Sequence, residues 1–346
     1  MKAIVFHEYG SPDVLKFEDV SLPVPRFGEV RIAVHAATVN RVLDVSLRNG
    51  GGLQRGVVLP CIPGVDCAGT IDAVGPGVMR WKLGDRVAAT GTMPLEPCAD
   101  DDSSYDGPMG MMGIMRPGGF AEFVTVPARA LIALPPALSF HTAAVAIRHV
   151  PMAWNLMCNG AKLRAGEWVL VMGASGNLGS IGIQIAKNVI GAHVIAAAGS
   201  HERAQIGLGL GADSAIDYGS SDIYDEVMRI TDRRGVDVVY DNVGNPPVFA
   251  RAFQTLRFGG RLVTAGAHAG SHATIDLVHL YSHGITIHGM VGRRRSDEER
   301  AVQLVSEEKI ALRIDRVMPL SQAAEAHRSM ESELDTGKIV LDPTLG

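Results

Sequence analysis

Three regularly spaced glycines carry the clearest chemical signal in this sequence. Gly173, Gly176 and Gly179 follow the apolar run 169–172 and precede the apolar-rich segment 177–190. A strand, a glycine turn and a helix in this order place backbone N–H groups and the positive end of a helix dipole against a dinucleotide pyrophosphate. We therefore expect a nucleotide site; the alternative is a turn whose glycines serve close packing alone. The candidate cofactor contacts in this turn are Gly173, Ala174, Ser175, Gly176, Asn177 and Leu178.

The end of the next strand, at 192–198, distinguishes the two nicotinamide cofactors. NAD sites carry an Asp or Glu about 20 residues after the glycine turn, where it binds the ribose 2′-hydroxyl. Here the strand ends in Ala198-Gly199-Ser200, and Arg203 follows. A site without that carboxylate does not repel a 2′-phosphate, and an arginine can pair with one. The pattern predicts NADPH; the alternative is that Glu202 binds the ribose from one turn further on.

The elements around this turn predict the fold class. Apolar runs typical of buried parallel strands recur at 169–172, 194–198, 215–217, 236–240, 261–265 and 285–290. Helix candidates lie between them, near 177–190, 201–210, 221–232 and 246–257. Such alternation is typical of an α/β protein with a doubly wound parallel sheet. We expect a six-stranded sheet that forms a complete dinucleotide-binding (Rossmann) domain.

The first third of the chain has a different pattern. Segment 30–36 alternates polar and apolar residues, and glycine and proline recur at short intervals. Short strands at such spacing favour a small barrel or sandwich. Residues 90–119 combine a run of acids with Met109, Met111, Met112 and Met115. We interpret this segment as a long surface excursion, either a solvated loop or an active-site lid whose methionines contact substrate.

Composition and charge exclude several classes of protein. The 346 residues are 47% hydrophobic and 20% charged, which is typical of globular chains and sufficient for two domains. A formal net charge of −5 argues against nucleic acid or an acidic membrane as the main partner. No apolar run reaches the length of a membrane span, and the first residues are typical of a strand rather than a secretory signal. The 4 cysteines form no C-x-x-C pair, so we expect a cytoplasmic protein in a reducing compartment.

Several segments, taken in order, resemble the medium-chain dehydrogenase/reductase superfamily. They are Gly64-Val65-Asp66-Cys67-Ala68-Gly69-Thr70, Gly84-Asp85-Arg86-Val87, Gly118-Gly119-Phe120-Ala121-Glu122-Phe123, the Gly173 turn, Leu210-Gly211-Ala212-Asp213, Phe258-Gly259-Gly260-Arg261 and Gly337-Lys338. The resemblance covers essentially the whole chain. It implies a GroES-like, strand-rich catalytic domain at 1–128, a Rossmann domain at 129–292 and a return to the catalytic domain at 293–346. It also implies a homodimer formed through edge strands of the nucleotide domain.

The family has a zinc branch (alcohol dehydrogenases) and a zinc-free branch (quinone oxidoreductases and enoyl-type reductases). Catalytic zinc needs three Cys, His or carboxylate ligands and an open position. At the positions that match the ligands of the zinc branch, this sequence has Arg41, Val65 and Arg148. Neither arginine nor valine binds zinc, so we expect a chain without zinc.

The zinc-free branch matches at more positions. Asn40 and Asp44 match its Asn-x-x-x-Asp, whose asparagine lies near the nicotinamide in that branch. Positions that match its 2′-phosphate and cofactor-groove residues are Gly199, Ser200, Arg203, Tyr218, Asn242, Val243, Gly266 and Ala267. The sequence departs from quinone reductases at two points. The tyrosine that often follows the Arg-x-Gly at 48–50 is absent, and Met152 replaces the usual threonine before Ala153-Trp154.

Without a metal, the negative charge that develops on a substrate oxygen needs fixed hydrogen-bond donors. Arg41 and Arg148 could hold that charge, or a substrate carboxylate, in bidentate fashion. The alternative is that they pair structurally with Asp44 or Asp66. His149 is a candidate proton donor by residue type, and the alternative is a buried structural histidine.

We therefore expect a zinc-independent oxidoreductase that uses NADPH to reduce a small carbonyl-activated substrate (an enone, an enal or a quinone) by hydride transfer. The alternatives are a zinc-independent alcohol dehydrogenase or carbonyl reductase, and a non-catalytic, crystallin-like NADPH-binding protein. The expected partner is a small-molecule substrate rather than nucleic acid or membrane. The expected catalytic residues are Asn40, Arg41, Asp44, Arg148 and His149.

Overall fold

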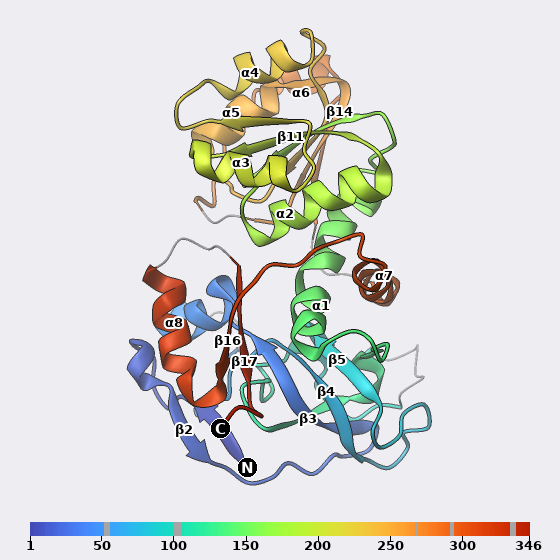
Figure 1. Ribbon diagram of the computed structural model, residues 1–346, viewed down its shortest axis with the longest axis vertical. Coiled ribbons are helices and arrows are strands. Elements are labelled where there is room, and N and C mark those ends of the chain that lie inside the picture. Colours follow the sequence, from blue (N-terminus) through green and yellow to red (C-terminus); the bar gives the residue numbers. More distant parts are fainter. Residues whose placement is uncertain (52–55, 100–105, 267–268, 291–293, 333–336) are drawn as a thin grey trace. The chain divides into compact units, whose positions relative to one another are not determined.

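The chain folds into two units that are described separately (Figure 1). The computed structural model describes residues 1–51, 56–99, 106–266, 269–290, 294–332 and 337–346. The strand-rich unit consists of Met1–Arg148 and Leu312–Gly346, and the nucleotide unit is His149–Ala311. The domain limits expected from the sequence, after residues 128 and 292, stay predictions. The first boundary between the two units, after Arg148, lies inside helix α1 (Phe140–Trp154), so each unit contains part of this helix.

The nucleotide unit is built on a six-stranded sheet whose strands are all parallel. The spatial order is β12-β11-β10-β13-β14-β15, which is the 3-2-1-4-5-6 order of dinucleotide-binding folds. The strands are β10 (Trp168–Met172), β11 (His193–Ala198), β12 (Ser214–Asp217), β13 (Val236–Asp241), β14 (Leu256–Thr264) and β15 (Thr286–Gly289). The six-stranded Rossmann sheet expected from the sequence is confirmed.

Helices connect or follow these strands, and four of them have N-termini that are capped by side chains. The helices are α2 (Asn177–Gln184) with its continuation η7 (Ile185–Ile190), α3 (His201–Gly209), α4 (Ile223–Ile230), α5 (Pro246–Gln254), α6 (Leu277–Ser282) and α7 (Arg295–Ser306). Ser200, Asp222, Asn245 and Asp276 each accept a hydrogen bond from a backbone N–H in the first turn of α3, α4, α5 and α6. These caps satisfy donors that a helix leaves unpaired, so they fix where each helix begins.

The strand-rich unit contains a seven-stranded sheet with the path β16-β17-β3-β4-β5-β9, and β8 pairs with β3 beside that path. The strands are β3 (Glu29–Thr38), β4 (Asp66–Val74), β5 (Arg86–Thr90), β8 (Phe123–Pro127), β9 (Leu131–Ala133), β16 (Ile314–Pro319) and β17 (Lys338–Asp342). Two short pairs, β1 (Lys2–Val5) with β2 (Lys16–Asp19) and β6 (Thr92–Pro94) with β7 (Met109–Met111), lie outside this sheet. The strand-rich GroES-like architecture is thereby confirmed. Strand β17 is antiparallel to β3, so the end of the chain completes the sheet that its beginning starts.

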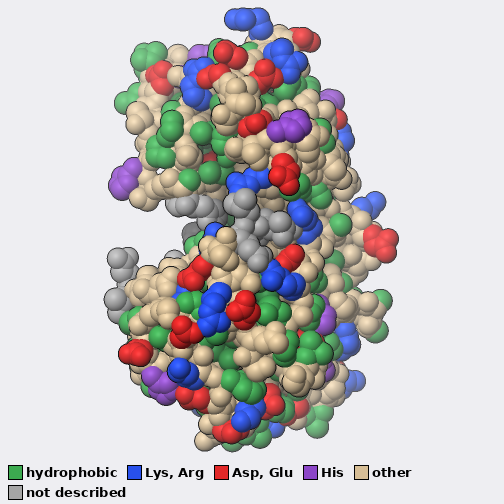
Figure 2. All heavy atoms as spheres, turned by 60° about the vertical axis from the view of Figure 1, so that its left-hand side comes forward, with side chains coloured by type: hydrophobic (Ala, Val, Ile, Leu, Met, Phe, Trp, Pro, Cys, Tyr) green, Lys and Arg blue, Asp and Glu red, His purple; other side chains and the backbone are tan. Residues whose placement is uncertain are grey.

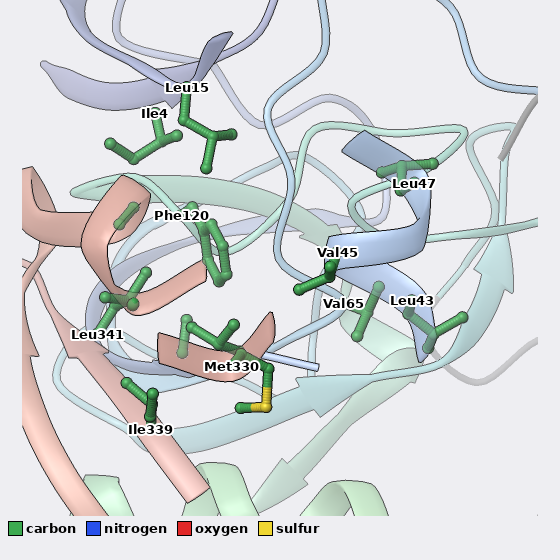
Figure 3. Packing of buried hydrophobic residues seen from close by; sticks show 14 of the residues in the cluster. Ile4, Leu15, Leu43, Val45, Leu47, Val65, Phe120, Met330, Ile339 and Leu341 are labelled. Atoms are coloured by element: carbon green, nitrogen blue, oxygen red, sulfur yellow. The ribbon is translucent and has the colours of Figure 1, made fainter. Parts of the chain in front are cut away.

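A buried apolar cluster holds the segment that carries several candidate catalytic residues. The π-helical turns η2 (Arg41–Val45) and η3 (Leu47–Gly51) insert Leu43, Val45 and Leu47 into this cluster. Figure 3 shows these side chains together with Val65, Phe120 and Met330, the last from helix α8 (Ala323–Ser332). Because the apolar side chains of these turns pack into the cluster, the polar side chains of the same turns contact other partners.

Within the excursion at 90–119, strands β6 and β7 form an antiparallel pair. Met112 is 0% exposed and belongs to the core, whereas Met109 and Met115 are 48% and 44% exposed. The expectation of adaptable surface methionines therefore does not hold for Met112. The acidic run at 100–105 lies outside the described residues.

The surface has mixed charge. On the face in Figure 2, lysine and arginine side chains lie among aspartate and glutamate side chains. In the part of the chain that the structure describes, no helix combines the length and the hydropathy that a membrane crossing requires.

Candidate functional site

The glycine turn of the nucleotide unit has the geometry that a phosphate cradle needs. Gly173 directly follows β10 and has φ +69°, a left-handed conformation that favours glycine. A Cβ on Gly179 would lie 2.1 Å from the Gly173 carbonyl oxygen, so α2 can approach the turn only with glycine there. Gly176 is the N-cap of α2, and its N–H donates to the Gly173 oxygen at 3.0 Å. The first turn of α2 thus offers backbone N–H groups to an anion.

Two residues of β13 and its C-terminal end brace this turn. The Asn242 side chain donates through Nδ2 to the Met172 carbonyl oxygen at 2.8 Å. The buried Tyr240 hydroxyl donates to the Leu178 carbonyl oxygen at 3.0 Å. A Cβ on Gly173 would meet Asn242 Oδ1 at 2.7 Å, so the asparagine lies directly against the glycine. Asn242, expected to line the cofactor groove, therefore also shapes the turn.

Four residues expected at a 2′-phosphate lie together at the C-terminal end of β11. The Ser200 hydroxyl accepts from the backbone N–H of Arg203 at 3.4 Å. A Cβ on Gly199 would lie 3.3 Å from the Tyr218 ring. Burial raises the pKa of Tyr218, and the positive charge of Arg203 opposes that shift. Glu202, the alternative ribose ligand, is exposed on the same first turn of α3.

The remaining groove candidates follow the adjacent strands. Val243 accompanies Asn242 after β13, and Gly266 follows β14. A Cβ on Gly266 would be 2.2 Å from the Asn242 carbonyl oxygen, so these two backbones run in close contact. Ala174 is buried, whereas Ser175, Asn177 and Leu178 are partly exposed around the turn. Ala267 lies outside the described residues.

In the strand-rich unit, Asn40 and Asp44 close the turn η2. The backbone N–H of Asn40 donates to Asp44 Oδ2 at 2.8 Å, and the N–H of Gly64 donates to Asp44 Oδ1 at 3.1 Å. Both side chains are buried, with 5% exposure for Asn40 and 0% for Asp44. Arg41 and Val42, between them, are exposed. The turn is therefore fixed from inside and presents Arg41 outward.

The Asn40 amide connects this turn to a second buried carboxylate. Nδ2 donates to Thr38 Oγ1 at 3.1 Å and to Asp66 Oδ2 at 3.2 Å, and Oδ1 accepts from Lys338 Nζ at 3.1 Å. Asp66 also accepts from the N–H and the hydroxyl of Thr38, at 2.7 and 2.6 Å. The amide is thus engaged on both sides within the strand-rich unit.

The two carboxylates differ in their electrostatic surroundings. Burial raises the pKa of Asp44 to about 7, and the negative charge of Asp66 acts in the same direction. Burial also raises the pKa of Asp66, but the two Thr38 hydrogen bonds and the charges of Arg148 and Lys338 oppose that shift. Burial therefore raises the pKa of both carboxyls, and the Asp44 carboxyl, with a pKa of about 7, titrates near neutrality.

The structure places the other two candidates next to each other in α1. Arg148 is partly buried and close enough to Asp66 for its charge to lower the pKa of that carboxyl. The structural pairing of Arg148 with Asp66, which was the alternative for this arginine, stays a prediction. His149 is also partly buried and is the first residue of the nucleotide unit.

The residues present do not fit a catalytic zinc ion. Arg41 and Arg148 supply cations, and Val65 is a fully buried apolar core residue. Within the described residues, no group of three or more His, Cys, Asp or Glu side chains is arranged to hold a metal ion. Zinc needs such a set of neutral or anionic ligands.

Sequence reasoning missed two members of the buried polar cluster. Thr38 ends β3, where it is indistinguishable from any strand threonine, and Lys338 was recognised only as part of a family landmark. A signal for Lys338 existed, because a lysine that begins an apolar closing strand must bury its ammonium against an acceptor. Its partner, Asn40, could not be read from the sequence.

Comparisons with known proteins identify the class. Residues 26–136 match the family model of the alcohol dehydrogenase GroES-like domain, and residues 178–307 match the model described as zinc-binding dehydrogenase. The chain is 30% identical to the quinone oxidoreductase of Sus scrofa over 99% of this chain and 97% of that protein. It is 30% identical to an NAD-dependent alcohol dehydrogenase of Sulfolobus acidocaldarius, over 99% and 100%.

A third relative and a solved structure agree with this class. The chain is 31% identical to the chloroplastic NADPH-dependent alkenal/one oxidoreductase of Arabidopsis thaliana, over 99% of this chain and 80% of that protein. The crystal structure of AibC superposes with a TM-score of 0.91 at 31% identity, covering 99% of this chain and 95% of that one. Proteins of this kind are NAD(P)-dependent oxidoreductases. The chain belongs to the medium-chain dehydrogenase/reductase superfamily, which has quinone oxidoreductase-like members.

Proposed function

We propose that this protein is a zinc-independent, NADPH-dependent oxidoreductase that reduces a small carbonyl-activated substrate, such as an enone, an enal or a quinone. The observation that carries the proposal is the grouping of Gly199, Ser200, Arg203 and Tyr218 at the end of β11. A guanidinium, a hydroxyl and the N-terminus of α3 there suit a dianionic 2′-phosphate.

The cofactor would lie along the nucleotide unit. The Gly173 turn and the first turn of α2 would hold the pyrophosphate through backbone N–H groups. When bound, the nicotinamide supplies a hydride, which is chemistry that the protein's own side chains do not provide. The alkenal/one oxidoreductase relative supports NADPH, and the alcohol dehydrogenase relative, named as NAD-dependent, makes cofactor choice the first point to test.

The proposal of a protein without zinc depends on Arg41, Val65 and Arg148, because neither arginine nor valine binds zinc. In place of metal ligands, the strand-rich unit has a braced turn with an exposed cation, Arg41, and a second, partly buried cation, Arg148. Fixed cations stabilise negative charge on a substrate oxygen without metal. Asp44, Asp66 and Lys338 each form a hydrogen bond with Asn40, the residue that precedes Arg41, and so brace the turn that begins at Arg41.

A steady-state assay tests the proposal directly. Purified protein treated with a chelator is assayed for oxidation of NADPH and of NADH with an enone, an enal, a quinone and a simple aldehyde. We expect turnover that survives the chelator and a lower KM for NADPH than for NADH. Loss of activity that zinc restores, or a preference for NADH, contradicts the proposal.

Product analysis separates the main alternative. The relative that is named as an alcohol dehydrogenase favours interconversion of alcohols and carbonyls as the second candidate. Reduction of an enone at C=C gives a saturated ketone, whereas reduction at C=O gives an allylic alcohol. Tight NADPH binding with no turnover on any substrate would instead indicate a non-catalytic, crystallin-like binding protein.

The proposed assembly is a homodimer through the β15 edge of the nucleotide unit. Strand β15 ends the six-stranded order, and the large apolar side chains nearby are exposed: Phe258 71%, Leu277 67%, Val278 61% and Tyr281 73%. Gly259 donates to the His283 carbonyl oxygen at 2.7 Å, so the Phe258 turn adjoins α6. A second copy can satisfy both the open strand edge and the apolar side chains, because an isologous contact repeats each of them.

Light scattering after size exclusion tests this assembly. The wild type is expected at twice the chain mass, and Leu277→Asp at the chain mass. Met79→Asp, which alters a methionine of the strand-rich unit that is even more exposed (89%) than Leu277 (67%), serves as the control and should leave the dimer intact. A monomeric wild type contradicts the proposed dimer.

A further inference from the structure

The phenol of Tyr240 connects the parallel sheet to the helix that follows the glycine turn. Tyr240 lies in β13, opposite Val171 of β10, and its side chain is 0% exposed. The hydroxyl donates to the Leu178 carbonyl oxygen at 3.0 Å, in the first turn of α2. This one hydrogen bond therefore links the strand beside β10 to the helix end that follows the glycines.

A glycine in α2 makes room for this phenol. A Cβ on Gly182 would lie 3.2 Å from Cζ of Tyr240 and 3.3 Å from Cε of Met157. Glycine is unfavourable inside a helix relative to alanine, so its presence at this position is explained by the close approach of the ring. A phenylalanine ring would fill the same space. Packing alone therefore accounts for the ring and leaves the hydroxyl to be explained.

Thr255 shows a buried hydroxyl with a purely local role in the same unit. It is 0% exposed, and Oγ1 donates to the carbonyl oxygen of Ala252 at 2.6 Å, near the C-terminal end of α5. Tyr240 instead reaches across 62 residues of sequence to the N-terminal turn of α2. Burial raises the pKa of the Tyr240 phenol, so its proton stays available for this bond.

The accepting carbonyl belongs to the peptide group that joins Leu178 to Gly179. Gly176 is the N-cap of α2, and the N–H of Ser180 donates back to the Gly176 oxygen at 2.8 Å. The N–H of Gly179 precedes that first helical bond, and such N–H groups have no acceptor within their helix. A hydrogen bond to the carbonyl oxygen polarises the peptide group and makes its N–H a stronger donor. Tyr240 therefore acts on a donor at the helix end that suits an anion.

We propose that Tyr240 is a positioning residue of the cofactor site, whose hydroxyl orients and polarises the Leu178–Gly179 peptide group so that the Gly179 N–H binds the cofactor pyrophosphate. The assignment rests on the proposed cofactor site at the glycine turn. NADPH and NADH share the pyrophosphate, whereas the 2′-phosphate belongs to NADPH alone. Tyr240 therefore contributes equally to the binding of both cofactors, in contrast to Arg203.

The first experiment compares Tyr240→Phe with Thr255→Val. Each variant removes one buried hydroxyl that donates to a helix carbonyl oxygen and leaves a side chain of similar shape. The Kd values for NADPH and NADH are measured by fluorescence titration, and thermal melting measures stability. We expect Tyr240→Phe to raise both Kd values by the same factor, roughly 3- to 10-fold. Thr255→Val should lower the melting temperature to a similar extent and leave both Kd values within about 2-fold of wild type.

A second variant reaches the same hydrogen bond from the helix. The Cβ of Gly182→Ala pushes the Tyr240 ring away from α2, so this variant should also raise both Kd values. Because both substitutions act through one hydrogen bond, the double variant should stay within about 2-fold of Tyr240→Phe. If Tyr240→Phe does not fold, Gly182→Ala decides, and unchanged Kd values in it overturn the assignment.

Amide spectra of the NADPH complex test the polarisation itself. In Tyr240→Phe the amide proton of Gly179 should move upfield, since its peptide group loses a hydrogen bond. The amide proton of Gly176, which donates to the Gly173 oxygen, is the control and should not move. An unmoved Gly179 proton overturns the assignment.

The binding data separate this assignment from the proposed function. A wild type that binds neither NADPH nor NADH overturns both. A wild type that binds cofactor, with unchanged Kd values in Tyr240→Phe, overturns only the assignment. So do equal losses of affinity in Tyr240→Phe and Thr255→Val, or a loss confined to one of the two cofactors.

Discussion

The ammonium of Lys338 donates a 3.1 Å hydrogen bond to Oδ1 of Asn40, across 298 residues of sequence. Lys338 begins β17, and Asn40 is the N-cap of η2. The closing strand therefore contributes a charge, as well as backbone pairing with β3, to the turn that presents Arg41. Residues from both ends of the chain define the polar interior of the strand-rich unit.

Close packing distinguishes two glycines of the same turn. A Cβ on Gly179 would lie 2.1 Å from the Gly173 carbonyl oxygen, whereas one on Gly176 would lie 3.4 Å from it, an ordinary contact. We expect Gly179→Ala to lower the free energy of unfolding by more than ~2 kcal/mol and Gly176→Ala by less than ~1 kcal/mol. Urea denaturation without cofactor measures both values. Equal losses would show that the approach of α2 is not what requires glycine.

Removal of the Arg203 side chain should change cofactor choice. A charge-assisted hydrogen bond contributes about 1.5–3 kcal/mol, so Arg203→Ala should raise the KM for NADPH roughly 10- to 100-fold. The KM for NADH should change little, since NADH lacks the 2′-phosphate. Arg229→Ala, at an exposed arginine of α4 paired with Glu226, is the control. If the two cofactors are affected equally, Arg203 does not contact the phosphate.

The Asp44 carboxyl should make unfolding pH-dependent near neutrality. Its pKa is about 7 in the folded chain against 3.8 for an ordinary aspartate, so the folded state keeps a proton that the unfolded state releases. The stabilisation that comes from this bound proton is complete below the pKa of Asp44 in the unfolded chain. It is lost as pH rises through the pKa of Asp44 in the folded chain. We expect a decline of roughly 1.4 kcal/mol per pH unit from this group between pH 5 and 7.

Urea titrations at pH 5, 6 and 7 measure that decline. In Asp44→Asn the slope attributable to this residue disappears, although overall stability falls because one backbone donor loses its acceptor. Asp72→Asn provides the matched control and keeps the wild-type slope. Identical slopes in wild type and Asp44→Asn would show that Asp44 is ionised throughout.

His327 should give the opposite dependence in acid. Burial, and to a smaller extent the Arg48 charge, lower its pKa to about 3. Neither ring nitrogen has a hydrogen-bond partner among the described residues. The unfolded chain binds a proton below the ordinary pKa of 6.5, so stability falls as pH drops from there toward the folded value.

Replacement of this histidine should remove that acid sensitivity. His327→Leu is expected to gain about 2 kcal/mol relative to wild type on going from pH 7.5 to pH 5. His7→Leu, at an exposed histidine that contacts Glu18, should not show the gain. Thermal melts across this pH range decide, and parallel wild-type and His327→Leu curves would contradict the prediction.

The parallel sheet could be predicted because its signals are local. Val169, Leu170 and Val171 are apolar in succession since β10 is buried on both faces, and glycine must follow where the chain turns with positive φ. The same applies to Ser200, whose residue type suits an N-cap. Periodicity and turn chemistry are properties of adjacent residues, so one sequence suffices to detect them.

The polar cluster could not be predicted from such signals. Asn40, Asp66 and Lys338 come from three segments, and only the pairing of β17 with β3 and of β3 with β4 brings them together. Sequence spacing contains no information on that convergence. The sequence suggested that Arg41 or Arg148 could pair with Asp44 or Asp66, and that pairing stays a prediction.

The division of the chain also sets an order of biosynthesis. The nucleotide unit is continuous in sequence, whereas the strand-rich unit needs residues that follow it. During translation, Asp66 and Asn40 leave the ribosome long before Lys338 does, and the nucleotide unit can fold in the interval. Until the final strand arrives, the nascent chain exposes an open edge of β3 and lacks the cation that Asn40 binds, so this is the period in which a chaperone would be of most use.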